Sequence, residues 1–562
     1  MPCKSMESRG FYLHLRERTE VEPFKKRWTM KYPIGIQDFQ KIIREGYVYV
    51  DKTDLVFRLV TEGKIYFLIR PRRFGKSLLV STLENYFLGR KELFKGLAME
   101  RLETEWKQYP VFHIDFNGGN FEKDGELAAR IEGYIADWEL RYGSHPHKRT
   151  MGERFAYVLR QAHEQTGRRA VVLIDEYDKP LLDVLDTEAY GLLNGERTRL
   201  EDIHRGILKA FYSVFKLADA DLQFVLLTGV TKFSQVSVFS GFNQPKDISL
   251  DARYEALCGI TEEEVSRYFS EPVRDLAEAE GVTEEEMREI IRHQYDGYHF
   301  GPRLTDIYNP FSLLNCFDSQ QLDNYWFKTG TPTYLVRLLH RTQEHVNEMV
   351  GRYYATGDFV DYKATAERPL PMFYQSGYLT IKAYDRRSRS FLLDFPNNEV
   401  KAGFLALVAA DYLKPADSQT ESWLANVSRS LYAGDVSSFR RQLTALLSST
   451  TYRMRNRQDE VELERYFQYT FFLVMKMIGT CFVEIEKETS QGRIDCVVET
   501  PGYVYILEFK RDGSALSALR QIEEKGYALP YAADPRRLFR IGVNFSSKTG
   551  TVAEFEVDPP VD

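Results

Sequence analysis

The sequence predicts an α/β protein, with a large N-terminal unit of alternating strands and helices and a smaller α/β unit at the C-terminal end. Three observations support this prediction. Short apolar runs alternate with helical patterns between residues 31 and 255, a Gly-Lys-Ser tripeptide follows one of these runs, and two apolar runs near the C-terminus carry acidic side chains. With 562 residues, the chain has room for roughly two to four domains with large hydrophobic cores.

The Gly-Lys-Ser tripeptide lies between a predicted strand and a predicted helix. Apolar residues at 65–69 indicate a buried strand, a tight loop follows, and the pattern after Ser77 is helical. This is the arrangement of a P-loop, in which backbone N–H groups and the helix N-terminus hold phosphate oxygens, Lys76 neutralises the outer phosphates and Ser77 binds Mg²⁺. Arg70 stands where the usual spacing has a glycine, so an ordinary basic turn before a helix is the alternative interpretation.

A carboxylate pair at the end of a second apolar run favours the P-loop interpretation. Residues 170–174 are all apolar and precede Asp175 and Glu176, which is typical of a central parallel strand with acids at its carboxyl edge. There, Asp175 would hold Mg²⁺ through water, and Glu176 would polarise the water that attacks the γ-phosphate. The alternative is a buried strand that ends in a solvated acidic turn.

The order of the predicted elements defines the type of P-loop core. The remaining elements are a strand at 111–116, helices within 124–165, a helix at 201–218, a strand at 222–229 and a last short strand at 247–250. In the chain, one strand thus separates the P-loop strand from the acidic strand. This predicts the additional-strand type of P-loop NTPase core, in which the catalytic glutamate follows the acidic strand.

Further candidates for the nucleotide site lie after the acidic strand. Thr228, at the carboxyl end of its strand, is placed to sense the γ-phosphate, but a threonine that caps a turn fits equally well. Lys232 and Arg253 are candidates for an arginine-finger contact or for solvated surface. The residues predicted to bind ATP are Arg72, Arg73, Phe74, Gly75, Lys76, Ser77, Leu78, Asp175 and Thr228, with Ser77 and Asp175 at the Mg²⁺.

Composition shifts divide the chain into five predicted segments. A flexible tail at 1–30 precedes the P-loop domain at 31–255, and a helical lid with a winged-helix-like unit is expected at 256–395. The lid begins with a capping box at Thr261. A helical linker is expected at 396–455, followed by the C-terminal α/β domain at 456–562.

The C-terminal domain carries a second group of candidate catalytic residues. Two apolar strands flank the turn at Pro501, with Asp495 on the first and with Glu508 and Lys510 alternating on one face of the second. Two carboxylates can hold Mg²⁺ beside a scissile phosphate, and the lysine can orient or deprotonate the attacking water. An edge-strand ion pair between Glu508 and Lys510 is the alternative. Glu464, on a predicted helix, is a candidate for a third acid at this metal site.

The overall composition describes a globular protein. The net charge of −7 gives no global attraction to nucleic acid or membrane, so contact with a polyanion must come from local basic patches. No apolar stretch is long enough to span a bilayer, and no secretory signal is visible. A cytoplasmic location is expected because the five cysteines lack paired spacing: Cys3, Cys258, Cys316, Cys481 and Cys496.

These motifs together resemble a bacterial family of AAA-ATPase-like proteins with a C-terminal PD-(D/E)xK nuclease domain. The resemblance extends over nearly everything from Tyr32 onward and includes arginine at position 70 as the family's usual P-loop form. It implies a restriction-endonuclease-like fold for the C-terminal domain, with Asp495, Glu508 and Lys510 as nuclease residues and Gln521 similar to the accessory glutamine of RecB-like nucleases. The motifs that carry it are Tyr32–Phe39, Tyr49–Thr53, Arg70–Ser77, Leu173–Asp178, Thr228–Ser234, Tyr308–Phe311, Tyr325–Gly330 and Ile541–Phe545.

The leading hypothesis is an ATP-regulated, Mg²⁺-dependent nuclease that acts on DNA, with catalytic residues Glu176, Asp495, Glu508, Lys510 and Gln521. A second hypothesis is a switch ATPase whose nuclease-like domain only binds nucleic acid. A third is a non-enzymatic scaffold, which the intact pairs of acids make the weakest of the three. An assembly of several identical subunits is compatible with each.

Overall fold

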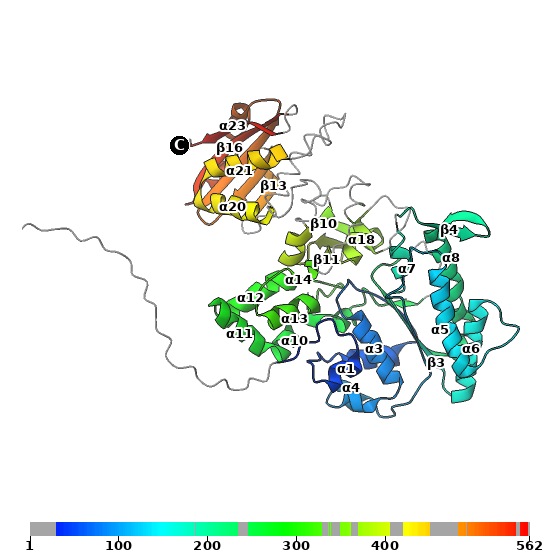
Figure 1. Ribbon diagram of the computed structural model, residues 1–562. Coiled ribbons are helices and arrows are strands. Elements are labelled where there is room, and N and C mark those ends of the chain that lie inside the picture. Colours follow the sequence, from blue (N-terminus) through cyan, green and yellow to red (C-terminus); the bar gives the residue numbers. More distant parts are fainter. Residues whose placement is uncertain are drawn as a thin grey trace, which may run out of the picture.

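A computed structural model describes residues 30–185, 187–233, 245–328, 335, 338, 349–360, 369–404, 420–449, 482–489, 492–546 and 551–559. Nearly all of the tail expected at 1–30, parts of the lid and winged-helix-like region expected at 256–395, and Glu464 lie outside these residues. Figure 1 shows a large N-terminal half, in which helices surround a central sheet, and a C-terminal unit with a sheet of its own.

The central sheet of the N-terminal half consists of five parallel strands in the order β2-β3-β6-β1-β7. Along the chain, β2 lies between the P-loop strand β1 and the acidic strand β3. In the sheet, however, the strand between β1 and β3 is β6. This order brings the P-loop, the acid pair and Thr228 to one edge, because parallel strands end on the same side. The strands are β1 (Ile65–Ile69), β2 (Val111–Asp115), β3 (Ala170–Asp175), β6 (Leu222–Gly229) and β7 (Lys246–Asp247).

The strands are buried because helices pack on the sheet. Every residue of β3 is buried, as expected for a central parallel strand. The two-residue β7 is shorter than the strand expected at 247–250, and the β4–β5 hairpin was not predicted. The other elements of this part are α1 (Phe39–Arg44), α2 (Thr53–Glu62), α3 (Lys76–Phe87), α4 (Ala98–Leu102), α5 (Glu126–Tyr142), α6 (Met151–Thr166), α7 (Lys179–Leu182), β4 (Tyr190–Leu193), β5 (Glu196–Arg199), α8 (Leu200–Tyr212) and α9 (Val214–Leu217).

A helical lid follows the sheet and has a hydrophobic core of its own. Its first helix begins with the predicted capping box, in which Thr261 and Glu264 satisfy each other's backbone N–H groups. Tyr32 and Ile34, from the start of the described chain, pack against this core. The elements of the lid are α10 (Glu262–Tyr268), α11 (Ser270–Glu280), α12 (Glu284–Tyr295), α13 (Pro310–Ser319) and α14 (Tyr325–Lys328), with the short strand pair β8 (Ile260–Thr261) and β9 (Ile307–Tyr308).

The region expected to be winged-helix-like forms a three-stranded antiparallel sheet in the order β10-β12-β11, with two short helices. Its buried side chains, among them Phe373, Tyr378 and Phe404, belong to the same core as the central sheet. The unit is therefore packed into the N-terminal half. Its elements are β10 (Arg352–Ala355), α17 (Thr356–Phe359), α18 (Leu370–Gln375), β11 (Thr380–Asp385) and β12 (Ser390–Asp394).

The C-terminal sheet has the order β13-β14-β15-β16-β17, in which only the β15–β16 pair is parallel. α23 provides the crossover between β15 and β16 and packs on one face of the sheet, while α20 and α21 pack on the other. The elements are α20 (Thr420–Ala433), α21 (Val436–Ser449), β13 (Phe482–Thr489), β14 (Gly492–Glu499), β15 (Tyr503–Arg511), α23 (Ala515–Glu524), β16 (Arg537–Ser546) and β17 (Thr551–Asp558).

The helical linker expected at 396–455 does not stand apart from the two units. Val400 and Phe404 are buried in the core of the N-terminal half. Val427 and Leu431 of α20, and Val436, Phe439 and Leu443 of α21, are buried in that of the C-terminal sheet. The sequence showed helical periodicity but not which core each apolar face would join. No helix within the described ranges is long and apolar enough to cross a membrane.

Candidate functional site

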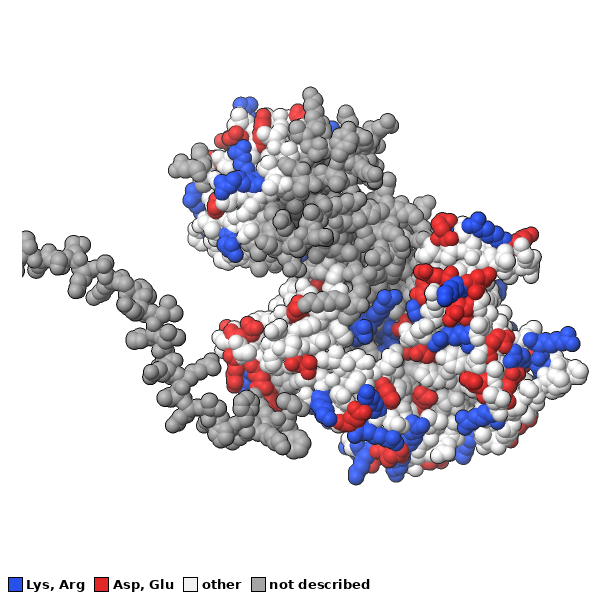
Figure 2. Space-filling model, viewed as in Figure 1, with Lys and Arg blue, Asp and Glu red and all other residues white. Residues whose placement is uncertain are grey.

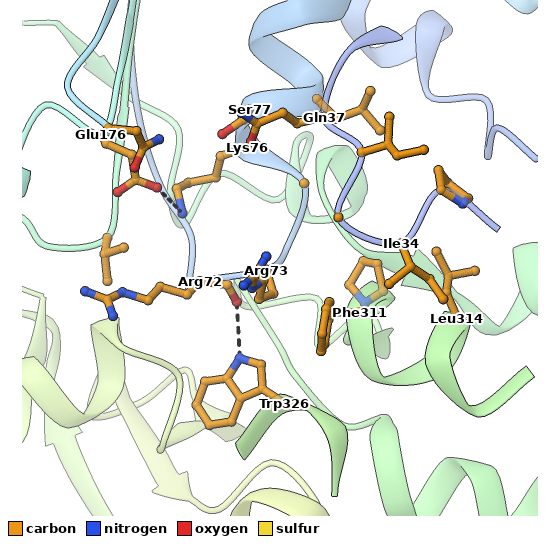
Figure 3. A pocket seen from close by; sticks show the side chains of 18 of the residues that line it. Ile34, Gln37, Arg72, Arg73, Lys76, Ser77, Glu176, Phe311, Leu314 and Trp326 are labelled. Carbon is orange, nitrogen blue, oxygen red and sulfur yellow. Dashed lines mark hydrogen bonds and ion pairs between the residues drawn. The ribbon is translucent and has the colours of Figure 1, made fainter. Parts of the chain in front are cut away.

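A cavity of about 530 Å³ opens at the carboxyl edge of the central sheet, in front of the P-loop. It has a charged end, where Lys76 and Glu176 lie, and an apolar end, where Ile34, Phe311 and Leu314 lie (Figure 3). A nucleotide has the same division between charged phosphates and an aromatic base. The cavity thus has both the size and the polarity of a nucleotide site.

The loop at the charged end has the geometry of an anion-binding turn. Gly75 has a φ of +90°, a left-handed conformation that favours glycine, and it caps the N-terminus of α3. α3 consequently directs its first backbone N–H groups towards the cavity, where a helix terminus favours negative charge. Arg72, Arg73, Ser77 and Leu78 line the same cavity.

Lys76 and Glu176 form an ion pair at the charged end of the cavity. The Lys76 ammonium lies 3.5 Å from a Glu176 carboxylate oxygen and 3.3 Å from the carbonyl oxygen of Pro71. Glu176 has a φ of +52°, which is uncommon for a residue with a side chain and costs on the order of 1–3 kcal/mol. This sharp turn directly after β3 directs the carboxylate back to the P-loop.

Asp175 and Thr228 lie behind the cavity wall and are both buried. The Thr228 hydroxyl donates to Asp175 at 2.5 Å, and the Glu176 backbone N–H donates to the same carboxylate oxygen at 3.0 Å. Thr228 therefore contacts the acid of the neighbouring strand directly. Its position fits a role that acts through Asp175.

Arg70 has a structural role that explains why it can replace the first P-loop glycine. Its guanidinium is buried and donates to the carbonyl oxygens of Ile69, Ser249 and Tyr254, at 2.8, 2.9 and 3.1 Å. It also lies 4.2 Å from the ring centroid of Phe300. The side chain thus points into the core and leaves the space over the loop open.

Phe74, predicted among the ATP-binding residues, directs its side chain away from the cavity. The ring is buried and packs edge-on against Tyr298 and Phe300, with centroids at 4.8 and 5.3 Å. An aromatic side chain inside a P-loop gave no sign of which way it would point. Phe74 anchors the loop to the segment that follows α12.

The apolar end of the cavity was not predicted from the sequence. Pro33–Gln37 come from the start of the described chain, while Phe311, Leu314 and Trp326 come from the lid. The Trp326 indole N–H donates to the Arg72 carbonyl oxygen at 3.2 Å, and the Arg73 guanidinium lies 4.9 Å from the Phe311 ring centroid. These contacts join segments far apart in the sequence, so no local pattern could have revealed them.

The two arginine-finger candidates do not line this cavity. Lys232 lies 3.0 Å from an Asp247 carboxylate oxygen. Arg253 pairs with Asp251 and Glu62, at 2.6 and 3.0 Å, on the surface. Within one chain, both positions fit structural ion pairs better than contact with a phosphate.

Asp178 is a buried acid next to the site that the sequence did not single out. One of its carboxylate oxygens accepts from the backbone N–H groups of Val230 and Thr231, at 3.0 and 2.5 Å, and the other has no hydrogen-bond partner among the described residues. Burial, followed by the charge of Glu176, raises the pKa of Asp178 to about 7. Asp178 therefore fixes the chain that leaves β6 beside the nucleotide cavity.

We expect Asp178→Ala to lower the free energy of unfolding by roughly 2–4 kcal/mol, because it leaves two buried N–H groups without an acceptor. Asp178→Asn retains an acceptor oxygen and should cost less than half as much. Urea unfolding at pH 7 measures both values. Equal losses for the two variants would contradict this assignment.

The C-terminal site lies where β14 and β15 separate. Their ladder ends at the pair Cys496–Leu507, and beyond it the Phe509 backbone N–H donates to the Asp495 carboxylate at 2.8 Å. The carboxylate of Asp495 thus occupies the position that a backbone acceptor would fill in a continued ladder. This places it next to Glu508 on the neighbouring strand.

Glu508, Lys510 and Gln521 form one connected group on the α23 face of the sheet. The Lys510 ammonium donates to the Gln521 side-chain oxygen at 2.6 Å and lies 3.7 Å from a Glu508 oxygen, and the Gln521 amide donates to the same Glu508 oxygen. Alternation along β15 turns Tyr505, Leu507 and Phe509 to the other face. The structure therefore brings Asp495, Glu508, Lys510 and Gln521 together.

Glu508 is unusually buried for a carboxylate, with 2% of its surface exposed. One of its oxygens has no hydrogen-bond partner among the described residues. Burial, together with the nearby charge of Asp495, raises the pKa of Glu508 to about 7, although Lys510 opposes this shift. An unpartnered carboxylate oxygen beside a second carboxylate is what a bound divalent cation would stabilise.

These residues fit a magnesium ion, which prefers oxygen ligands and retains several waters. Asp495 and Glu508 supply two carboxylates, and no group of three or more His, Cys, Asp or Glu side chains suited to a metal was found in the described ranges. The remaining ligands would come from water, backbone or phosphate. Glu464, the candidate third acid, lies outside the described part of the chain.

Comparisons with known proteins match the regions that contain the two sites. A family described as "Predicted AAA-ATPase" matches residues 33–239, and the PD-(D/E)XK nuclease superfamily matches residues 462–555. A relative from Azotobacter chroococcum mcd 1, described as "Uncharacterized protein in vnfD 5'region", is 36% identical over 534 residues, which cover 94% of this chain and 99% of the relative. The chain therefore belongs to the family of AAA-ATPase-like proteins that carry a C-terminal domain of the PD-(D/E)XK nuclease superfamily.

Proposed function

We propose that the protein hydrolyses ATP and cleaves phosphodiester bonds in DNA with Mg²⁺. The observation that carries the proposal is the group of Asp495, Glu508, Lys510 and Gln521, in which a buried Glu508 oxygen has no hydrogen-bond partner among the described residues. A structural ion pair between Glu508 and Lys510 alone would not require Asp495 beside it. Desolvating two carboxylates costs several kcal/mol, which a bound cation offsets.

At the nucleotide site, each residue has a separate task. The N-terminus of α3 and Lys76 would bind the β- and γ-phosphates, and Ser77 and Asp175 would hold the Mg²⁺. A phosphate beside Lys76 would compete with Glu176 for the ammonium, freeing that carboxylate to accept a proton from the attacking water. Ile34, Phe311 and Leu314 would surround the base.

At the C-terminal site, Asp495 and Glu508 would hold the Mg²⁺, which would polarise the scissile phosphate. Lys510 would orient the attacking water and stabilise the negative charge that develops on the phosphate. Gln521 would hold the Lys510 ammonium in position through its side-chain oxygen. Gln521 is thus a positioning residue rather than a metal ligand.

Basic side chains near the C-terminal site would support contact with a polyanionic substrate. In the view of Figure 2, acidic and basic side chains are interspersed over both the N-terminal half and the C-terminal unit. Arg520 and Lys525 are exposed near Gln521 on and beside α23. Such side chains would contact phosphates of a strand that reaches Lys510.

The test uses purified full-length protein and supercoiled plasmid in four mixtures, with and without ATP and with and without Mg²⁺. We expect nicked or linear products only when Mg²⁺ is present, and a change in their rate when ATP is added. Release of phosphate from ATP is measured in the same mixtures. Binding of plasmid without any Mg²⁺-dependent product would favour the switch ATPase instead.

Divalent-cation binding at the C-terminal site should depend on pH. Because the pKa of Glu508 is raised to about 7, its proton must leave before a metal binds. We expect the affinity for Mn²⁺ or Mg²⁺ to rise by roughly tenfold per pH unit up to about pH 7 and to level off above it. Calorimetric titrations between pH 6 and 8 measure this affinity. In Glu508→Gln, the rise of affinity with pH below pH 7 should disappear. Affinity that is constant over this range would contradict the proposed ligand.

A further inference from the structure

Three aromatic residues of the nucleotide cavity form a continuous contact to the helix at 398–404. Trp326, Phe327 and Tyr378 all line the cavity. The Tyr378 ring lies 5.1 Å from that of Trp326 and 5.3 Å from that of Phe404, measured between centroids. Cavity wall and helix therefore belong to one packed cluster.

Phe327 fits this helix closely enough to require a glycine. A Cβ atom on Gly403 would lie 2.3 Å from the Phe327 ring, a distance that real contacts do not show. The helix thus packs directly against α14. Displacement of one would displace the other, because packed interiors transmit movement rather than absorb it.

Glu399, at the start of the same helix, adds a polar connection. It is fully buried, and one carboxylate oxygen accepts from the Trp326 backbone N–H at 2.7 Å. The indole of the same tryptophan donates to the carbonyl oxygen of Arg72 in the P-loop. Trp326 therefore links the P-loop to Glu399 through two hydrogen bonds.

We propose that Trp326 and Glu399 transmit occupancy of the nucleotide cavity to the helix at 398–404. This helix is the last described element of the N-terminal half, and residues 405–419 connect it to α20 of the C-terminal unit. The proposal rests on the nucleotide site proposed above and names the route by which that site regulates the C-terminal unit. Glu399 and Trp326 are positioning residues, and neither performs chemistry.

The protonation state of Glu399 decides which substitution preserves the connection. Burial raises the pKa of Glu399 to about 7, and the surrounding groups that contribute are Ser312, the Trp326 backbone and Asp323. A neutral carboxyl group accepts a hydrogen bond through its carbonyl oxygen, as an amide does. Glu399→Gln should therefore retain the contact to Trp326, whereas Glu399→Ala removes it.

The experiment is hydrogen–deuterium exchange on the full chain with and without Mg²⁺ and a non-hydrolysable ATP analogue, with the affinity for the analogue measured separately. We expect the analogue to slow exchange at 398–404 by about fivefold or more in the wild type, and in Glu399→Gln as well. In Glu399→Ala and Trp326→Phe this protection should be lost, with exchange measured at analogue concentrations that saturate each variant. Trp326→Phe keeps an aromatic ring at this position but removes the hydrogen bond to Arg72. It therefore tests the inference even if Glu399→Ala does not fold.

The matched control is Glu255→Gln, which changes another buried acid that accepts from two backbone N–H groups, those of Arg303 and Thr305. It should leave the protection at 398–404 unchanged. A wild-type protein that binds the analogue without any change at 398–404 would overturn this inference and leave the ATPase proposal intact. Failure to bind the analogue at all would instead contradict the nucleotide site.

Discussion

Asp495→Ala is expected to reduce Mg²⁺-dependent DNA cleavage by at least about a hundredfold while ATP turnover stays near that of the wild type. Asp495 supplies one of the two carboxylates that would hold the metal, and loss of a directly coordinating group usually costs more than loss of an outer-shell partner, which costs about 10–100-fold. The nucleotide cavity has separate walls and a separate core, so its chemistry should not change. Gel assays of plasmid cleavage and phosphate release measure the two activities.

Asp495 also accepts a hydrogen bond from the Phe509 backbone, so alanine could disturb the strands themselves. Asp495→Asn retains an acceptor for this bond but removes the negative charge, and we expect it to be almost as inactive as the alanine variant. Glu523→Ala, an exposed acid on α23 of the same domain, is the matched control and should cleave as the wild type does. Wild-type cleavage by Asp495→Asn and Asp495→Ala would rule out the proposed nuclease site.

Lys76→Ala is expected to weaken ATP binding by at least about a hundredfold, or nearly 3 kcal/mol, because it removes the buried cation at the charged end of the cavity. The variant also removes the positive charge that interacts with Glu176 and Asp178, so these carboxylates would repel phosphate more strongly. Fluorescence titration with a labelled ATP analogue measures the affinity. Hydrolysis should fall below detection at nucleotide concentrations that saturate the wild type.

The control for Lys76→Ala is Lys209→Ala, which removes an exposed lysine from α8 outside the cavity and should leave the affinity unchanged. DNA cleavage without ATP should be the same in Lys76→Ala and the wild type, because the C-terminal site is separate. Any stimulation of cleavage by ATP should disappear. If Lys76→Ala bound the analogue as tightly as the wild type does, the nucleotide would have to lie elsewhere.

Local chemistry in the sequence determined the two candidate sites and most of the elements that carry them. A P-loop and an acid pair at a strand end follow from short runs of residues, and alternation along β15 places Glu508 and Lys510 on one face whatever the rest of the chain does. The parallel central sheet, the separate C-terminal sheet and the family are confirmed by the structure and the comparisons. The roles of the individual site residues remain predictions.

Only the tertiary structure decided which distant segments complete each site. The sequence could not show that Ile34 and Trp326 wall the nucleotide cavity, that Phe74 turns inward, or that α20 and α21 pack on the C-terminal sheet. It did predict a helical segment at 396–455, because helical periodicity follows from residue spacing. Which surface buries each face depends on the sum of many long-range contacts, and no short stretch of sequence contains that information.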